Sequence, residues 1–200
     1  MPVIDTRLLW ASVGDVHSFA VQLSRWENAG ILLKLKRGMY VLADAYRKTE
    51  PYMPYVAAQL HKPSYISLEK ALEYHGLVPE AILVWTSVTT KRPALYDTPI
   101  GRFSYRHVKK ELFWGYQSVS GNGWRGFMAL PEKALLDYFY FFNGEVTAEF
   151  IDEMRFQNLD TVDRARMHAF ASRFNKPKLI RAAEMFEAHA QEALSGEKTL

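Results

Sequence analysis

The segment from residue 15 to residue 42 carries side chains whose types suit contact with double-stranded DNA. Histidine, serine, glutamine and arginine side chains can hydrogen-bond to base edges or phosphates, and lysine and arginine neutralise the phosphate backbone. Their spacing predicts that four of them share one face of a helix and that three lie beside a tight turn. The predicted DNA-binding residues are His17, Ser18, Gln22, Arg25, Lys34, Lys36 and Arg37.

A second basic set lies further along the chain and consists of Lys91, Arg92, Arg102, Arg106, Lys109 and Lys110. In a strand over residues 102–108, alternation places Arg102, Ser104 and Arg106 on one face of a sheet. The aromatic side chains nearby could stack on exposed bases, and they are Tyr105, Trp114 and Tyr116. The alternative is a sheet face that is simply solvated.

The helix that would position the first set is predicted from its apolar spacing. Asp15 can cap the start of this helix, and Gly30 can adopt the left-handed conformation that ends it. Apolar residues recur at steps of three and four, which predicts one buried face. The residues expected on that buried face are Val16, Phe19, Ala20, Leu23 and Trp26.

A two-stranded ribbon is expected to follow this helix directly. Leu33 and Leu35 alternate with lysines, which is typical of a half-buried strand. Arg37 and Gly38 form a plausible two-residue turn before a return strand over residues 39–42. A helix followed by a hairpin with a basic tip predicts a winged helix, whereas a helix and hairpin with solvated lysines remains the alternative.

The residue types that support catalysis or bind a cofactor are scattered along the sequence. The segment 121–126 matches G-x-G-x-x-G, but a strand pattern follows it where a dinucleotide site needs a helix, so we expect a hairpin loop. The six histidines make no metal-binding spacing, and Asp137 in an apolar helix is expected to be a cap or an ion-pair partner. We therefore predict no enzyme activity, no cofactor and no metal site.

Composition and charge favour a globular protein. The chain has 200 residues, of which 48% are hydrophobic, a net charge of +3 and no cysteine. Positive charge is concentrated in the first 110 residues, as expected if one side meets a polyanion. The N-terminus lacks the pattern of a signal peptide, and no apolar run approaches the ~20 residues that span a bilayer. We expect a cytoplasmic protein with no membrane partner.

The predicted fold class is α+β, with two domains. Residues 1–48 would form the winged helix-turn-helix, with a short helix over residues 6–12 and a turn at 12–14 before the DNA-reading helix. A polar linker over residues 44–51 leads into a mixed domain, residues 49–200, which contains a small antiparallel sheet and ends in a helical bundle. Asp160 is expected to cap a helix that runs to Phe174. The first domain is too small to bury much by itself, so it should lean on the rest of the chain for its core.

Several segments in order resemble the AbiEi-type antitoxins of bacterial abortive-infection systems, which are also described as transcriptional regulators of viral (phage) defence and belong to type IV toxin-antitoxin systems. The segments are 37–42, 65–77, 88–93, 98–107 and 131–137. The resemblance implies an N-terminal winged helix that represses its own operon by binding inverted repeats in the promoter. It also implies a C-terminal domain that opposes a nucleotidyltransferase-like toxin without forming a stable complex. The leading helix of the family's DNA-binding domain is short or missing in this sequence.

Two other functions remain open on the residues alone. A protein-interaction module could use the basic face to bind an acidic partner without binding DNA. An enzyme acting on nucleic acid is disfavoured, because the sequence contains no recognisable set of catalytic residues.

Overall fold

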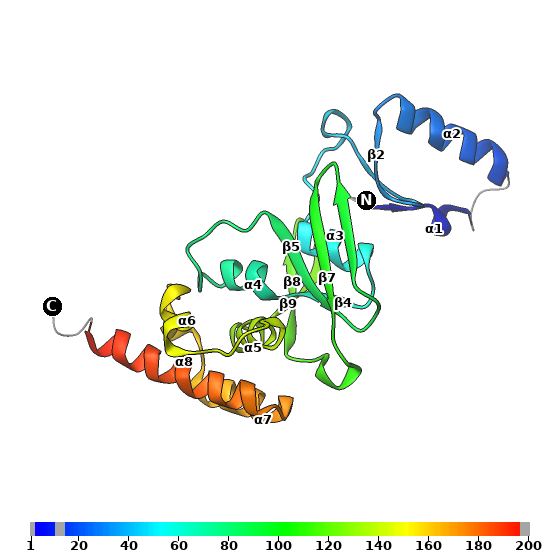
Figure 1. Cartoon of the computed structure of the whole chain (residues 1–200). Coiled ribbons are helices and arrows are strands. Elements are labelled where there is room, and N and C mark those ends of the chain that lie inside the picture. The colour runs from blue at the N-terminus through cyan, green and yellow to red at the C-terminus, as the bar shows by residue number, and fades with distance from the viewer. Residues whose placement is uncertain (1–2, 11–14, 197–200) are drawn as a thin grey trace.

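The fold is a mixed α+β arrangement in which two sheets follow one another along the molecule. The computed structural model describes residues 3–10 and 15–196. A three-stranded sheet lies at one end, a six-stranded sheet lies in the middle, and the last helices lie at the other end (Figure 1). The predicted α+β class is confirmed. The predicted turn at residues 12–14 lies outside the described residues.

The N-terminal unit contains three short strands and two helices, and its turns are those expected. Asp15 accepts hydrogen bonds from the backbone N–H groups of His17 and Ser18 and so caps the second helix. Gly30 and Gly38 have positive φ angles of 68° and 78°, which glycine adopts without strain. The elements are β1 (Ile4–Asp5), α1 (Thr6–Trp10), α2 (Val16–Asn28), β2 (Leu32–Lys36) and β3 (Met39–Leu42), and β3 lies between β1 and β2.

The core of this unit is divided between the two faces of its sheet. Leu23 of α2 packs with Leu32 and Tyr40 in a small separate cluster. Side chains on the other face, such as Leu35 and Val41, belong to the main core of the protein. The expectation that this unit leans on the rest of the chain is therefore confirmed.

The predicted buried face of α2 is wrong in extent. Only Leu23 is buried, whereas Val16 is 48% exposed and Trp26 is 36% exposed. Ala20 is exposed and Phe19 is half-buried. The physical reason is the small number of apolar side chains beneath: among the described residues, the cluster under α2 consists of Leu23, Leu32 and Tyr40, with only Ile4, Phe19 and Leu42 packed against it.

A six-stranded mixed sheet follows, and it is larger than the small antiparallel sheet predicted. The β5–β7 and β4–β9 pairs are parallel, and the remaining pairs are antiparallel. The strand order is β6-β7-β5-β4-β9-β8. Strands β4 and β6 were not predicted. The elements from the linker to this sheet are η1 (Asp44–Tyr46), α3 (Met53–Leu60), β4 (Ser64–Ile66), α4 (Leu68–Tyr74), β5 (Val84–Thr89), β6 (Ala94–Thr98), β7 (Gly101–His107), η2 (Lys110–Leu112), β8 (Tyr116–Gly121) and β9 (Trp124–Ala129).

Two helices cover opposite faces of this sheet. The Tyr105 hydroxyl donates a hydrogen bond of 2.7 Å to the Ala57 carbonyl of α3. The Tyr65 hydroxyl donates one of 2.9 Å to Asp137 of α5 (Pro131–Phe141). Tyr105 and Tyr65 pair with adjacent residues of β5, so their side chains leave the sheet on opposite sides.

The remaining helices pack on the outer side of α5, furthest from the N-terminal unit (Figure 1). They are α6 (Ala148–Glu153), η3 (Leu159–Thr161), α7 (Arg164–Phe174) and α8 (Pro177–Gly196). The predicted cap at Asp160 is wrong, because residues 159–161 form a separate 3-10 turn and Asp163 caps α7 instead. Within the described part of the chain, no helix has the length and apolar character needed to cross a membrane.

Candidate nucleic-acid interface

The outer side of α2 presents most of the polar side chains predicted to read DNA. This helix lies on the side of the N-terminal unit that faces away from the six-stranded sheet (Figure 1). His17, Ser18 and Arg25 are exposed, and Gln22 is half-buried. The Ser18 hydroxyl donates to Asp15 at 2.6 Å and so contributes to the helix cap. Arg25 has no ion-pair partner among residues 3–10 and 15–196, so its charge is available to a ligand.

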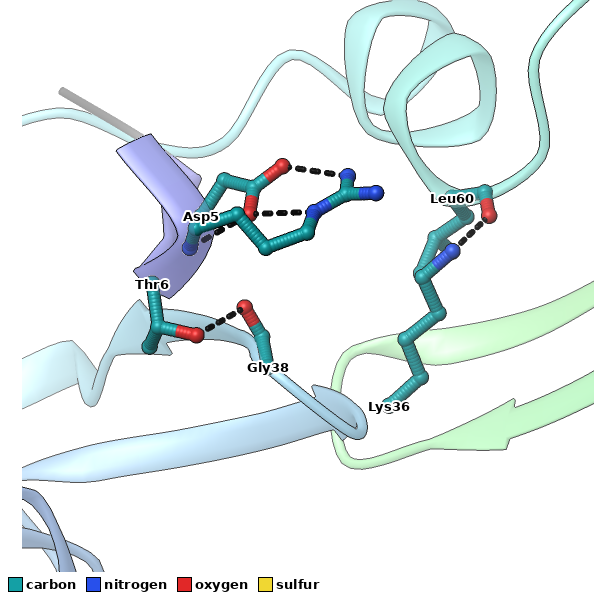
Figure 2. A network of polar contacts seen from close by, with 6 residues as sticks. Asp5, Thr6, Lys36, Gly38 and Leu60 are labelled. Atoms are coloured by element: carbon teal, nitrogen blue, oxygen red, sulfur yellow. Dashed lines mark hydrogen bonds and ion pairs between the residues drawn. The ribbon is translucent and has the colours of Figure 1, made fainter. Parts of the chain in front are cut away.

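The three cations of the β2–β3 hairpin have different environments. Lys34 forms an ion pair of 3.2 Å with Glu27 of α2. The Lys36 ammonium group donates a hydrogen bond to the Leu60 carbonyl at the end of α3, as Figure 2 shows. Arg37 is exposed and has no ion-pair partner in the described part of the chain. Of the two cations expected to be free at the tip of the hairpin, Arg37 is therefore free and Lys36 is not.

A register shift explains the inward position of Lys36. Lys34 lies opposite Tyr40 and Lys36 lies opposite Met39, so β2 gains one residue relative to β3 between them. Such a bulge breaks the alternation of faces from which an exposed Lys36 was inferred. The ammonium group lies 5.5 Å from the centre of the Tyr96 ring. Burial lowers the pKa of Lys36, and the positive charge of Arg7 lowers it further.

Replacing Lys36 by methionine is expected to loosen the N-terminal unit from the sheet. Methionine keeps the length of the apolar side chain, but it loses the charge over the Tyr96 ring and cannot donate to the Leu60 carbonyl. A hydrogen bond to a charged group contributes about 1.5–3 kcal/mol, and partial exposure brings the expected loss to about 1 kcal/mol. For a protein of this size that lowers Tm by roughly 2–4 °C. Thermal melting measures the shift, and hydrogen exchange of residues 32–42 should become faster.

Lys48→Met is the matched control, because Lys48 is exposed and contacts neither Leu60 nor Tyr96. It should leave the melting temperature and the exchange rates unchanged. Equal behaviour of the two variants would show that the Lys36 contact contributes nothing to docking.

The cations of the second basic set do not all lie together on the sheet. Val108 donates its N–H to the Thr89 carbonyl at 2.9 Å, which brings together the chain segments that follow β5 and β7. Arg102 lies at the start of β7 and pairs with Asp97 at 2.9 Å, and Arg106 lies 5.3 Å from the Phe141 ring. The exposed cations that gather beyond the ends of β5 and β7 are Lys91, Arg92, Lys109 and Lys110.

His61 links this group of cations to the docked hairpin. Its Nδ1 atom lies 3.2 Å from the Tyr96 hydroxyl, and its Nε2 atom lies 3.1 Å from the Arg92 carbonyl. Burial lowers the pKa of His61, and the charges of Lys36 and Lys91 lower it further. The ring is therefore neutral near pH 7, and it adds no charge to a junction that is already positive.

Two of the three aromatic residues expected to stack on bases belong to the core. Tyr105 is 1% exposed and Trp114 is 9% exposed, so neither ring is open to a base. Tyr116 is half-buried and lines a cavity together with Phe127, Lys62 and Arg125. The sequence analysis did not select Lys62, Arg125 or Phe127. Alternation within residues 124–129 places Arg125 and Phe127 on one face, but the neighbours of that face are set by distant segments.

A buried polar network connects α5 with β4. Lys133 and Asp137 are both fully buried and form an ion pair, which confirms the expectation for Asp137. Lys133 also donates to the Tyr65 hydroxyl at 2.9 Å, and Ser67 donates to Asp137 at 2.8 Å. Desolvation lowers the pKa of Lys133 and raises that of Tyr65. The network has no contact with solvent, so its geometry suits a structural role.

The remaining candidates from the sequence do not form a site. The G-x-G-x-x-G segment forms a hairpin in which β8 ends at Gly121 and β9 begins at Trp124, as predicted. No group of three histidine, aspartate or glutamate side chains within the described residues lies close enough to hold a metal ion. No protein-family model matches the chain, and no curated protein matches it either.

Proposed function

We propose that the chain is a DNA-binding antitoxin that represses its own operon through inverted repeats and counteracts a nucleotidyltransferase-type toxin. The observation that carries the proposal is the exposed outer side of α2, where Arg25 has a free charge, together with the free charge of Arg37 at the hairpin turn. The order strand, helix, helix, strand, strand, with β3 in the middle of the sheet, supports a winged helix that lacks a leading helix.

The proposed contacts follow from the environment of each side chain. Arg25 and Arg37 are the proposed contacts to phosphate, because both are exposed and neither has an ion-pair partner in the described part of the chain. His17 and Gln22 on the same helix are the proposed contacts to base edges. Lys34 can reach phosphate only by leaving Glu27. Lys36 would hold the hairpin in place rather than touch the duplex.

The antitoxin part of the proposal rests on the resemblance of segments 37–42, 65–77, 88–93, 98–107 and 131–137 to AbiEi-type proteins. That family acts in the bacterial cytoplasm, and the proposed partner is a toxin encoded beside the antitoxin. The proposal requires no cofactor. Co-expression with that toxin tests it, because the chain should restore growth without copurifying with the toxin.

A second function is favoured by one specific observation. Four exposed cations, Lys91, Arg92, Lys109 and Lys110, lie beside the docked hairpin and away from α2. A protein-interaction module would use this surface to bind an acidic partner, with no role for DNA. Copurification with the neighbouring gene product, together with absence of a DNA shift, would favour this second function.

Fluorescence anisotropy with the DNA upstream of the coding sequence tests the leading proposal. The expected result is tighter binding to the duplex with inverted repeats than to a scrambled duplex of equal length. The logarithm of affinity should fall linearly with the logarithm of salt concentration between about 50 and 200 mM, because bound phosphates release counterions. Equal and weak binding to both duplexes would contradict specific repression.

A further inference from the structure

A cavity of about 440 Å³ opens where the end of α3 meets the β8–β9 hairpin. Its volume lies within the range of about 300–1,000 Å³ that is typical of sites for small molecules. The cavity combines aromatic rings with cationic side chains. Its lining residues include Phe113, Tyr116, Phe127, Lys62, Arg125 and Ser64.

The aromatic wall of this cavity is held in place from behind. Tyr116 stacks on Tyr65 with ring centres 4.7 Å apart, and Tyr65 is itself fixed by its hydrogen bond to Asp137. The Phe127 ring centre lies 5.8 Å from that of Tyr116 at an interplanar angle of 79°, and Phe127 is 41% exposed. An exposed phenylalanine beside a fixed tyrosine offers a preformed surface on which a flat ring can stack.

The basic side chains around the cavity are not held in ion pairs with any residue that the structure describes. Lys62 and Arg125 are both exposed, and neither has an ion-pair partner in the described part of the chain. The Ser64 hydroxyl is buried and has no hydrogen-bond partner among residues 3–10 and 15–196. Its oxygen atom is closed off from solvent, so it is not counted among the groups that the cavity offers to a ligand. The cavity therefore offers positive charge next to an apolar wall.

We propose that this cavity binds a nucleoside phosphate. The base would stack on the exposed Phe127 ring, with Tyr116 as a second, nearly perpendicular wall, and the phosphate would contact Arg125 and Lys62. The flat ring and the negative charge belong to the same ligand, which fits the adjacent aromatic and cationic walls. A free nucleotide and one unit of a single strand share this chemistry. The inference concerns a different surface from α2 and is independent of the proposed contact with duplex DNA.

Binding of two probes to the full chain tests the proposal. One probe is a fluorescein-labelled strand of ten thymidine or uridine units, and the other is the set of four ribonucleoside monophosphates, used as competitors. Phe127→Leu should weaken binding about tenfold, as expected for the loss of one stacking ring. Arg125→Gln should reduce the salt dependence by about 0.7 in log-log slope, as expected for one lost phosphate contact on a single strand.

The controls separate this site from the proposed DNA interface. Arg181→Gln alters an exposed arginine of α8 that does not line the cavity, so it should leave probe binding unchanged. Neither Phe127→Leu nor Arg125→Gln should alter binding to the promoter duplex. Competition by monophosphates would identify a free nucleotide as the ligand, and binding of the strand alone would identify a unit of single-stranded nucleic acid. Absence of binding to both probes, or wild-type binding by both cavity variants, would overturn the proposal.

Discussion

Replacing Asp137 by asparagine is expected to lower the free energy of unfolding by about 3–5 kcal/mol, because it leaves the Lys133 charge buried without its partner. Asparagine keeps the shape of the side chain, so the loss reports the charge and not a cavity. For a protein of this size the loss corresponds to a fall in Tm of roughly 6–20 °C. Differential scanning calorimetry or thermal circular dichroism measures it directly.

Two controls define the origin of this effect. In the double variant Lys133→Met/Asp137→Asn, no buried charge is left, so most of the lost stability should return. The Met side chain can fill the space between Trp114 and Phe174, whose rings lie 5.1 and 4.6 Å from the Lys133 ammonium group. Arg155→Gln breaks an exposed ion pair with Glu80 and should change Tm by less than about 2 °C.

A melting temperature of Asp137→Asn close to that of the native chain would show that Lys133 loses its proton or reaches water when its partner is absent. The pKa of Lys133 is already lowered by desolvation, so loss of that proton is the alternative that the measurement addresses. In that case the ion pair would not be a principal source of stability.

The double variant Arg25→Gln/Arg37→Gln is expected to flatten the salt dependence of duplex binding by about 1.8 in log-log slope, since each lost phosphate contact on B-DNA contributes about 0.9. The loss of affinity should be similar for the promoter duplex and for a scrambled one, because phosphate contacts carry no sequence information. Both side chains are exposed, so folding should not change. Anisotropy titrations at several salt concentrations give the slope.

Gln22→Ala provides the complementary measurement on the same helix. Loss of a contact to a base edge should weaken binding to the promoter duplex by about 1–3 kcal/mol and leave binding to the scrambled duplex almost unchanged. For the Arg25→Gln/Arg37→Gln variant, Arg181→Gln again controls for the loss of positive charge. An unchanged salt slope in the Arg25/Arg37 variant would exclude α2 and the hairpin turn as the DNA-contacting surface.

The features predicted well from sequence are the alternation of faces within a strand and the chemistry of local turns and caps. In β7, the predicted division between a face with Phe103 and Tyr105 and a face with Arg102 and Arg106 is confirmed. The expectation that Tyr105 is open to bases is wrong, because its face is the buried one. The turn at Gly38 and the cap at Asp15 were also predicted, because each depends only on its immediate neighbours. Local chemistry and regular burial are visible in a single sequence.

The features that were missed depend on segments far apart in the chain. Strand β4 has three residues and exists because β5 and β9 pair with it on either side. Strand β6 forms an edge on which Leu95 is 65% exposed, so its apolar residues give no regular pattern of burial. The inward turn of Lys36 depends on a bulge, and the cavity beside Tyr116 depends on where α3 ends. No local rule could predict these neighbours.

The docking of the hairpin through Lys36 has a consequence for how two copies could share one operator. A DNA-binding domain on a flexible linker can adjust to variable half-site spacing, at an entropic cost on binding. Here Lys36 of the hairpin donates a hydrogen bond to the end of α3. Within the linker over residues 44–51, Arg47 forms ion pairs with Asp44 and Glu50. An N-terminal unit held in this orientation before binding loses little orientational freedom when it binds DNA. In the proposed repressor, inserting a few base pairs between the repeats should therefore abolish paired occupancy rather than weaken it gradually.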